Sequence, residues 1–253
     1  MLFQPNTISP EKLVSAIVDE NYRTAEVFRK HEISYCCGGR QPLQMACEQR
    51  GIETGKLAAE LGHSTRVINI SPSIDFASWD PIFLMDYIAH VHHGYLRGNL
   101  GQLQSLLGEF VAAHNKRYPY LKQIETLFTE LVIELRSSMF SEEQEIFPYI
   151  RQLCHAWQHR EPYGGLFIRT LRKPIEDMLM HTHDTVSMII LAVRRLTNAY
   201  DPPQAACINH KVVLARLKEL DADLVQHYWL EKECLFPKVS MMEKELLAEP
   251  AAL

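Results

Sequence analysis

Glycine is scarce in this sequence, with 11 residues in a chain of 253. A fold with many β-strands needs frequent tight turns, and glycine is one of the residues that most readily permit them. Hydrophobic residues make up 47% of the chain and charged residues 23%, as in an ordinary globular protein. A chain of this length has room for two domains and a sizeable core. The composition therefore favours a helical globular protein over a turn-rich β-fold.

The sequence also lacks an excess of positive charge, a targeting segment and a long apolar run. Its formal net charge is −5, which gives no electrostatic reason to expect nucleic acid or an anionic membrane as a partner. The segment from Met1 to Asn6 has no basic start leading into an apolar stretch, so no signal peptide is predicted. The longest apolar run, Met188 to Val193, is too short to span a bilayer. These absences predict a cytoplasmic protein without a membrane partner.

The cysteines show no spacing typical of a disulfide framework. There are six of them: Cys36, Cys37, Cys47, Cys154, Cys207 and Cys234. In a cytoplasmic protein they are expected to remain reduced thiols. Cys36 and Cys37 precede Gly38 and Gly39, which mark a turn that would leave the two thiols accessible. Because adjacent side chains diverge, this pair is poorly suited to chelating one metal ion. Residue chemistry alone does not decide whether the two thiols are reactive or incidental.

A repeated pattern of metal-binding residue types is the strongest chemical signal in the chain. His227 and Glu231 are four residues apart, so on a helix they lie on one face and can converge on one point. The segment ends in Phe-Pro, and a related segment that also ends in Phe-Pro occurs 89 residues earlier. There Glu142 takes the place of Glu231, and Ser138 takes the place of His227. The sequence is therefore predicted to contain two related helix pairs.

Two further histidines keep nearly the same period, because His93 and His183 are 90 residues apart. Their neighbours His92 and His181 are 89 residues apart, so the repeat alone does not decide which histidine of each pair faces inward. Carboxylates that can bridge two ions, together with several imidazoles, suit a di-iron site better than a tetrahedral zinc site. The predicted ligands are His93, Glu142, His183, His227 and Glu231, with the two glutamates as bridges.

Other polar residues near this pattern have simpler interpretations. Glu143, beside Glu142, is expected to be solvated. Lone histidines elsewhere in the chain are expected to be surface residues or satisfied polar residues. His92 and His181 are expected to point to other faces of their helices, where they could still support the predicted ligands.

The pattern of apolar residues predicts an all-α protein with two domains. Residues 1–66 are expected to form a small domain of short helices, residues 67–79 a linker, and residues 80–253 an antiparallel bundle of four long helices. Asp80 and Pro81 are typical of a helix start. A loop is predicted from His155 to about Lys173, where one proline and two glycines occur, with the third helix starting near Pro174.

Several of these segments resemble a known family. The run Tyr35-Cys36-Cys37-Gly38-Gly39, which follows Phe28-x-x-His31, resembles the small N-terminal domain of the repair-of-iron-centres family (RIC, the YtfE/ScdA type). The remainder resembles the hemerythrin-like bundle of the same family, over the segments that carry the five predicted ligands. The resemblance covers nearly the whole chain, and a Cys-Cys-Gly-Gly domain followed by such a bundle is a specific combination.

The resemblance implies a cytoplasmic di-iron protein that helps to restore iron–sulfur clusters damaged by nitric oxide or peroxide. Iron donation would be the main activity, with nitric oxide reduction at the di-iron centre as an additional one. The implied partners are damaged iron–sulfur proteins and the small molecules NO or O₂, and a homodimer is compatible with the resemblance. Cys36 and Cys37 would be the redox or delivery thiols. Two alternatives are a hemerythrin-like carrier or sensor of O₂ or NO without turnover, and an interaction protein with a metal-poor bundle.

Ser138 departs from the pattern of the family, whose members have histidine at this position. A serine hydroxyl is a poor iron ligand and is too short to imitate an imidazole, so one of the two iron sites is expected to be weakened. Water could fill the gap, or that ion could bind weakly. The change is compatible with small-ligand binding, with easier iron release and with a degenerate site.

Overall fold

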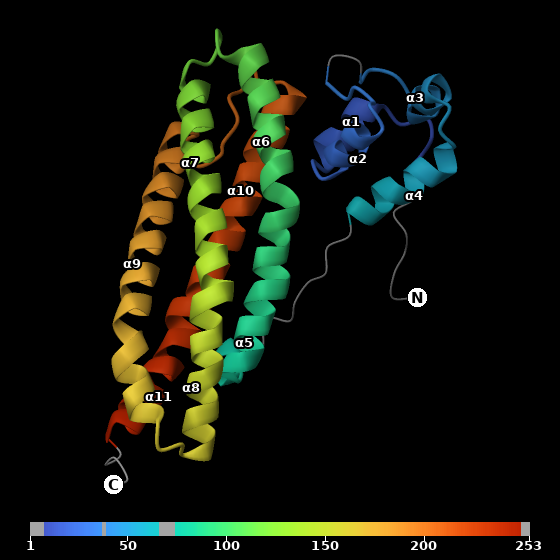
Figure 1. Cartoon of the computed structure of the whole chain (residues 1–253). Coiled ribbons are helices and arrows are strands. Elements are labelled where there is room, and N and C mark those ends of the chain that lie inside the picture. Colours follow the sequence, from blue (N-terminus) through green and yellow to red (C-terminus); the bar gives the residue numbers. More distant parts are fainter. Residues whose placement is uncertain (1–7, 37–38, 66–73, 249–253) are drawn as a thin grey trace. The chain divides into compact units, whose positions relative to one another are not determined.

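The computed structural model describes residues 8–36, 39–65 and 74–248, except for the side chains of residues 172–183. The internal contacts divide the chain into two compact units. The first unit consists of Met1–Pro72 and Tyr200–Lys218, and the second consists of Ser73–Ala199 and Glu219–Leu253. The described residues form helices and no strand, apart from one isolated β-bridge between Leu13 and Pro42 (Figure 1). The predicted all-α class is confirmed.

Four short helices form the N-terminal part of the first unit: α1 (Val14–Glu20), α2 (Thr24–Lys30), α3 (Leu43–Arg50) and α4 (Thr54–Ser64). Their apolar faces meet around Phe28, Leu43 and Leu61, which are fully buried. The backbone amide of Ser15 in α1 donates to the carbonyl of Gly39, over 2.9 Å. A side chain on Gly39 would collide with the carbonyl of Tyr35 and lie against Ser15. Glycine at this position therefore lets the backbone at Gly39 pack closely against α1.

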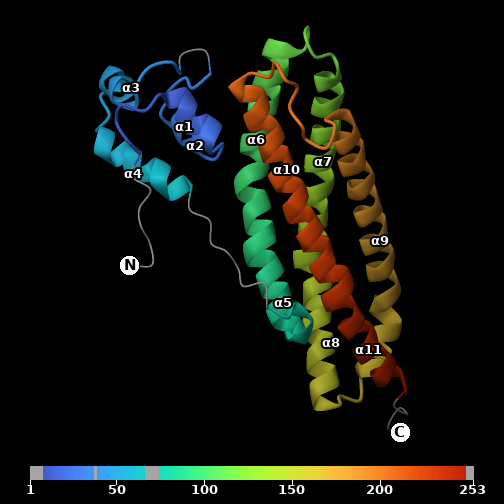
Figure 2. The same cartoon turned by 180° about the vertical axis from the view of Figure 1, so that it is seen from behind.

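The second unit is built on four helical segments that lie side by side and alternate in direction (Figures 1 and 2), and the fourth segment enters this unit at Glu219. Each long segment is described by its successive parts. The first segment comprises α5 (Pro81–Tyr87), η2 (Ile88–His93) and α6 (Gly94–His114), and the second comprises α7 (Tyr120–Ser141), η3 (Glu142–Ile146) and α8 (Phe147–His159). The third segment is the single helix α9 (Gly164–Leu196). The fourth comprises α10 (Ile208–Trp229), η4 (Leu230–Leu235) and α11 (Phe236–Ala248). A short 3₁₀ turn, η1 (Phe76–Ser78), precedes them.

Three of these segments are interrupted by a π-helical turn, at η2, η3 and η4. The amide of Phe147 donates to the carbonyl of Glu142, and the amide of Phe236 donates to the carbonyl of Glu231, so each bond spans five residues. A proline follows each phenylalanine and has no N–H of its own to continue an α-helical ladder. Such turns are rare and are frequent at functional sites. Here they occur at the positions that carry the predicted ligands.

The start of the bundle agrees with the sequence pattern. The Asp80 side chain accepts a hydrogen bond of 2.8 Å from the amide of Ile82, and Pro81 occupies the first helical turn. This cap satisfies an amide that the helix itself leaves without a partner.

The predicted loop from His155 to Lys173 is wrong for most of its length. Helix α8 continues to His159, the chain reverses at Arg160 in a left-handed conformation (φ 52°), and α9 already begins at Gly164. A Cβ atom on Gly164 would lie 3.0 Å from the side chain of Leu246 in α11. The glycine therefore serves close packing of two helices and does not mark a loop.

An apolar cluster fills the end of the bundle that contains α5, α8 and α11. It includes Ile88, Phe147, Ile150, Leu230 and Leu235, all buried. Because several of these residues belong to the π turns, the cluster fixes the backbone that carries the neighbouring polar residues. Among the described residues, no helix combines the length and the apolar character that a membrane span requires.

Candidate metal centre

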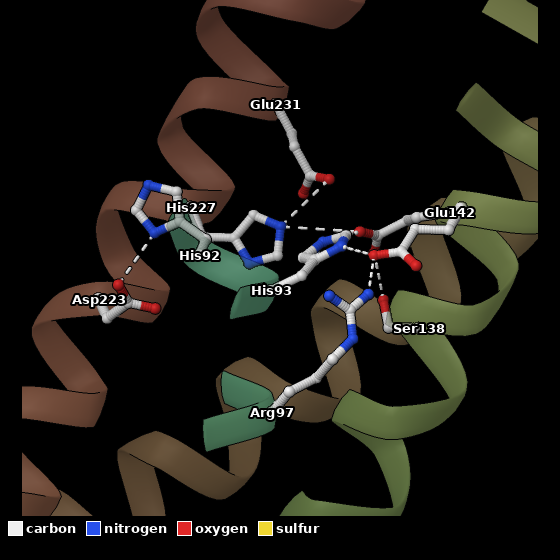
Figure 3. Close-up of polar contacts among 9 residues, drawn as sticks. His92, His93, Arg97, Ser138, Glu142, Asp223, His227 and Glu231 are labelled. Carbon is white, nitrogen blue, oxygen red and sulfur yellow. Dashed lines mark hydrogen bonds and ion pairs between the residues drawn. The ribbon is translucent and has the colours of Figure 1, made fainter. Parts of the chain in front are cut away.

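Four buried polar side chains meet inside the bundle, and we refer to them as the His/Glu cluster: His93, Glu142, His227 and Glu231. His93 ends η2, Glu142 begins η3, His227 lies near the end of α10 and Glu231 lies in η4. Each is at most 2% exposed. Figure 3 shows the four side chains pointing toward one another, with Ser138 next to Glu142. Burying unpaired charges is costly, so such a cluster needs mutual neutralisation or a bound ion.

Glu142 is the centre of the cluster. Its Oε2 atom lies 2.9 Å from Nε2 of His93 and 3.7 Å from Nε2 of His227. Nε2 of His227 also lies 3.4 Å from Oε1 of Glu231. One donor atom from each of His93, Glu142 and His227 lies within 4.8 Å of the others, a spacing at which they could hold one metal ion. The hydroxyl of Ser138 donates to Oε1 of Glu142.

The charges in the cluster are strongly coupled. Burial disfavours the charged form of His227, but Glu231 and Glu142 outweigh it and raise the pKa of His227 to about 10. Burial likewise opposes ionisation of Glu142, yet His227 and His93 hold the pKa of this carboxyl well below its usual range. When no ion is bound, protonated imidazole therefore balances carboxylate. A divalent cation could take over this role by replacing protons.

The donor set fits a borderline transition metal ion such as iron. Imidazole nitrogens suit Fe, Zn and Cu, and carboxylates suit harder ions, so a mixed set with two carboxylates is typical of di-iron bundles. Neither ring nitrogen of His227 makes a hydrogen bond to a described residue, but Nε2 lies 3.7 Å from Glu142 and 3.4 Å from Glu231. This orientation presents Nε2 to the inside of the cluster.

The remaining predicted site residues are not part of the His/Glu cluster or lie outside the residues that the structure describes. The backbone of His183 belongs to α9, but its side chain is outside the described residues. Cys37 is also outside them, and Cys36 is half-buried. Ser138 occupies the place one turn before Glu142 that corresponds to His227 before Glu231, and it is 7% exposed. The structure thus brings together four of the five predicted ligands, and the position of the fifth stays a prediction.

The expectation that Glu143 is solvated is wrong. Its Oε1 atom lies 2.6 Å from Nδ1 of His93, and the same oxygen accepts from the guanidinium of Arg97. The sequence carried a usable signal, since Arg97 follows His93 by four residues and thus lies on the same face. The π turn at η3 directs adjacent glutamates to the two nitrogens of one imidazole ring.

His92 and Asp223 form a second polar pair beside the cluster. Nδ1 of His92 lies 3.0 Å from Oδ1 of Asp223, and His92 is 1% exposed. The ring of His92 stacks on that of His227, with 5.5 Å between centroids and 15° between planes. Figure 3 shows this pair on the far side of His227 from Glu142. Asp223 precedes His227 by four residues, a spacing that could have drawn attention to it.

Comparison with known proteins relates the chain to iron–sulfur cluster repair proteins. Residues 10–65 match the ScdA_N family, described as a domain of unknown function, DUF542. The "Iron-sulfur cluster repair protein ScdA" of Staphylococcus epidermidis is 26% identical over 234 residues, which is 92% of this chain and 100% of that protein. The resemblance to the repair-of-iron-centres proteins is confirmed.

Two further relatives agree in length as well as in name. The ScdA protein of Staphylococcus haemolyticus is 25% identical over 233 residues, covering 92% of this chain and 100% of that protein. The "Iron-sulfur cluster repair protein YtfE" of Escherichia coli O1:K1 / APEC is 28% identical over 216 residues, covering 85% of this chain and 90% of that protein. The match thus includes both the N-terminal helices and the bundle with the His/Glu cluster.

The charge on His227 predicts how stability depends on pH when no metal is bound. The pKa of His227 is raised from 6.5 to about 10, so its contribution is fully present below pH 6.5 and is lost as the pH rises toward 10. The unfolding midpoint of chelator-treated protein should therefore fall over this range, by about 2–4 °C for each kcal/mol lost. In the His227→Gln variant this fall should be much smaller. Equal pH slopes of the two proteins, measured by circular dichroism, would contradict the assignment.

Proposed function

We propose that this protein repairs iron–sulfur clusters damaged by nitrosative or oxidative stress, by donating iron held at the His/Glu cluster. The observation that carries the proposal is the convergence of two carboxylates and two imidazoles, all buried, from three helical segments. Relatives that match over most of the chain are named iron–sulfur cluster repair proteins, which supports the same role. Damaged iron–sulfur proteins are then the expected partners.

Iron would be held by the carboxylates of Glu142 and Glu231 and the imidazoles of His93 and His227, with His183 as a further predicted ligand. Bound iron would supply the exchangeable Fe(II) that a damaged cluster needs, and redox chemistry toward small molecules. The residues of the chain orient the donor atoms, because the π turns η3 and η4 set the direction of the two glutamates. Burial excludes bulk water from all four side chains.

Two features of the cluster favour release of iron. Ser138 gives one ion a hydroxyl neighbour in place of an imidazole, and hydroxyl oxygen is a weak ligand. The raised pKa of His227, about 10, means that a proton binds firmly when an ion leaves. In the absence of an ion, a proton on His227 would keep the charges of Glu142 and Glu231 balanced. A donor needs such a second stable state, whereas a permanent cofactor site does not.

Cys36 and Cys37 are proposed as redox or delivery thiols of the N-terminal helices. Cys36 is half-buried. Gly39, which follows the Cys-Cys pair in the sequence, packs closely against α1. A thiolate near this point could bind iron in transit or contact a partner cluster.

Reduction or binding of nitric oxide is the second candidate function. The observation that favours it is Ser138, since a ligand-poor side of Glu142 would leave a coordination position for a small molecule. An O₂ or NO carrier without turnover would use the same position. Reversible spectral changes with O₂ that persist after Cys36→Ala and Cys37→Ala substitution would favour the carrier over repair.

A repair assay tests the main proposal directly. Protein loaded anaerobically with Fe(II) is mixed with a [4Fe–4S] dehydratase inactivated by nitric oxide, and recovery of dehydratase activity is followed. Recovery should be faster than with free Fe(II) at the same concentration, and a Glu142→Gln variant treated identically should give only the rate of free iron. If the loaded protein gives no advantage over free Fe(II), iron donation is excluded as its function.

A further inference from the structure

Both ring nitrogens of His93 are held by neighbouring carboxylates. Nε2 lies 2.9 Å from Oε2 of Glu142, and Nδ1 lies 2.6 Å from Oε1 of Glu143. The ring is fully buried and stacks on Phe147, with 5.9 Å between centroids and only 4° between planes. The imidazole therefore has a fixed plane and two different carboxylate partners. The glutamates are adjacent in sequence but reach opposite sides of the ring.

Glu143 differs from Glu142 in its exposure and in its second partner. Its side chain is 26% exposed, against 1% for Glu142. The guanidinium of Arg97, one turn beyond His93, donates to the same Oε1 atom that faces the ring. Figure 3 shows Arg97 on the side of His93 away from Glu231. Arg97 thus restrains Glu143, while Glu143 restrains His93.

We propose that Glu143, held by Arg97, is a positioning residue that makes Nε2 of His93 the nitrogen available to a metal ion. A carboxylate that accepts a hydrogen bond from Nδ1–H keeps the proton on that nitrogen, so the lone pair of Nε2 faces the His/Glu cluster. Glu142 would then act as a ligand and Glu143 as the outer support of His93, although the two glutamates are chemically identical. This inference rests on the proposed metal site and adds the residue that orients one of its ligands.

The pair is more than a surface ion pair. Exposed ion pairs contribute little because water and salt screen them. Here the imidazole is completely buried and stacks on Phe147, so the Glu143 carboxylate acts on a ring that water does not reach in the folded protein. Loss of the Glu143 carboxylate would leave a buried Nδ1–H without its partner or favour the other tautomer. Either change weakens a metal ligand at Nε2.

Metal titration of matched variants tests the proposal. Fe(II), added anaerobically, and Co(II), followed by its visible absorption, are titrated into the full-length protein and its variants. Glu143→Ala should weaken binding about 10–100-fold. Glu143→Gln, which keeps an acceptor oxygen and nearly the same shape, should weaken it less. Glu145→Ala, which removes an exposed carboxylate from the same turn, should leave the affinity unchanged. Arg97→Ala should give a loss between those of Glu145→Ala and Glu143→Ala.

A tautomer measurement separates positioning from general damage to the fold. In protein labelled with ¹⁵N at histidine and loaded with Zn(II), His93 should carry its proton on Nδ1, and Glu143→Ala should lose the hydrogen-bonded Nδ1–H signal. Unchanged affinity in Glu143→Ala and Glu143→Gln would overturn the inference while the proposed metal site stands. Failure of the unmodified protein to bind Fe(II) or Co(II) would instead remove the metal site itself.

Discussion

Glutamine in place of Glu142 is expected to abolish tight iron binding while the helical fold remains. Glu142 is the residue on which His93, His227 and Ser138 converge, and it is 1% exposed. Glutamine has nearly the same shape but no charge, and its amide cannot bridge two cations as a carboxylate can. The loss of affinity should exceed the 10–100-fold, roughly, that changes in supporting residues produce.

The same substitution should also change the cluster when no metal is bound. Glu142 is one of the two carboxylates that raise the pKa of His227, so the pKa of His227 should fall in the variant, with Glu231 as the remaining partner. The stability that is lost as the pH rises toward 10 should then be lost at lower pH. This shift is independent of iron, and it can be followed by thermal unfolding of chelator-treated protein.

The iron content of the Glu142→Gln variant, measured after anaerobic loading and gel filtration, tests the loss of binding. Circular dichroism of the same sample tests whether the helical fold remains. Glu145→Gln, an equal charge change at an exposed position of the same turn, is the matched control and should retain the iron content of the unmodified protein. If Glu142→Gln retains the same amount of iron per chain as this control, iron is held somewhere other than the His/Glu cluster.

The parts of the fold that depend on local pattern could be read from the sequence. Asp80 caps α5 as its position before a proline suggests, since this hydrogen bond involves only neighbouring residues. The 89-residue repeat correctly paired two segments, which the structure shows as the π turns η3 and η4. The spacing of His227 and Glu231 placed them on one face because four residues make about one helical turn. These inferences need no knowledge of distant contacts.

The parts that depend on distant contacts could not be read in this way. Gly164 suggested a loop, but it begins α9, where a Cβ atom would lie 3.0 Å from the side chain of Leu246 in α11. Glu143 seemed solvated because its partners, His93 and Arg97, lie about fifty residues earlier. The π turns also have no common sequence signal, since η3 and η4 are each followed by Phe-Pro whereas η2 is followed by Gly94. The residue types of the site could be predicted from the sequence, whereas their orientation is seen only in the structure.

Histidine in place of Ser138 is expected to make the protein hold iron more firmly. Ser138 stands one turn before Glu142, as His227 stands one turn before Glu231, and its hydroxyl already reaches the Glu142 carboxylate. An imidazole at this position could reach the same region and would offer a nitrogen ligand where a hydroxyl now lies. Transfer of iron to an external chelator should slow by about tenfold or more, which corresponds to a gain of about 1.4 kcal/mol or more if the barrier changes with affinity.

The stability of this variant should change in opposite directions with and without iron. Ser138 is buried, so a larger ring costs about 1–3 kcal/mol of packing energy when no ion compensates for it. Bound iron should reverse the sign, because a ligand that binds only the folded state stabilises it. Ser137→His places the same ring on an exposed face one residue earlier and should change neither property. A Ser138→His protein that loses iron as fast as Ser137→His would show that position 138 does not face the ion.

The repair assay turns this variant into a test of why the serine is there. If lability serves iron donation, Ser138→His should carry more iron per chain and yet restore a damaged cluster more slowly than the unmodified protein. If the serine merely weakens the site, the variant should restore the cluster at least as fast, because more iron is delivered per chain. The two outcomes differ in sign, so a single comparison of recovery rates at equal protein concentration separates a site selected to release iron from one that has partly lost its function.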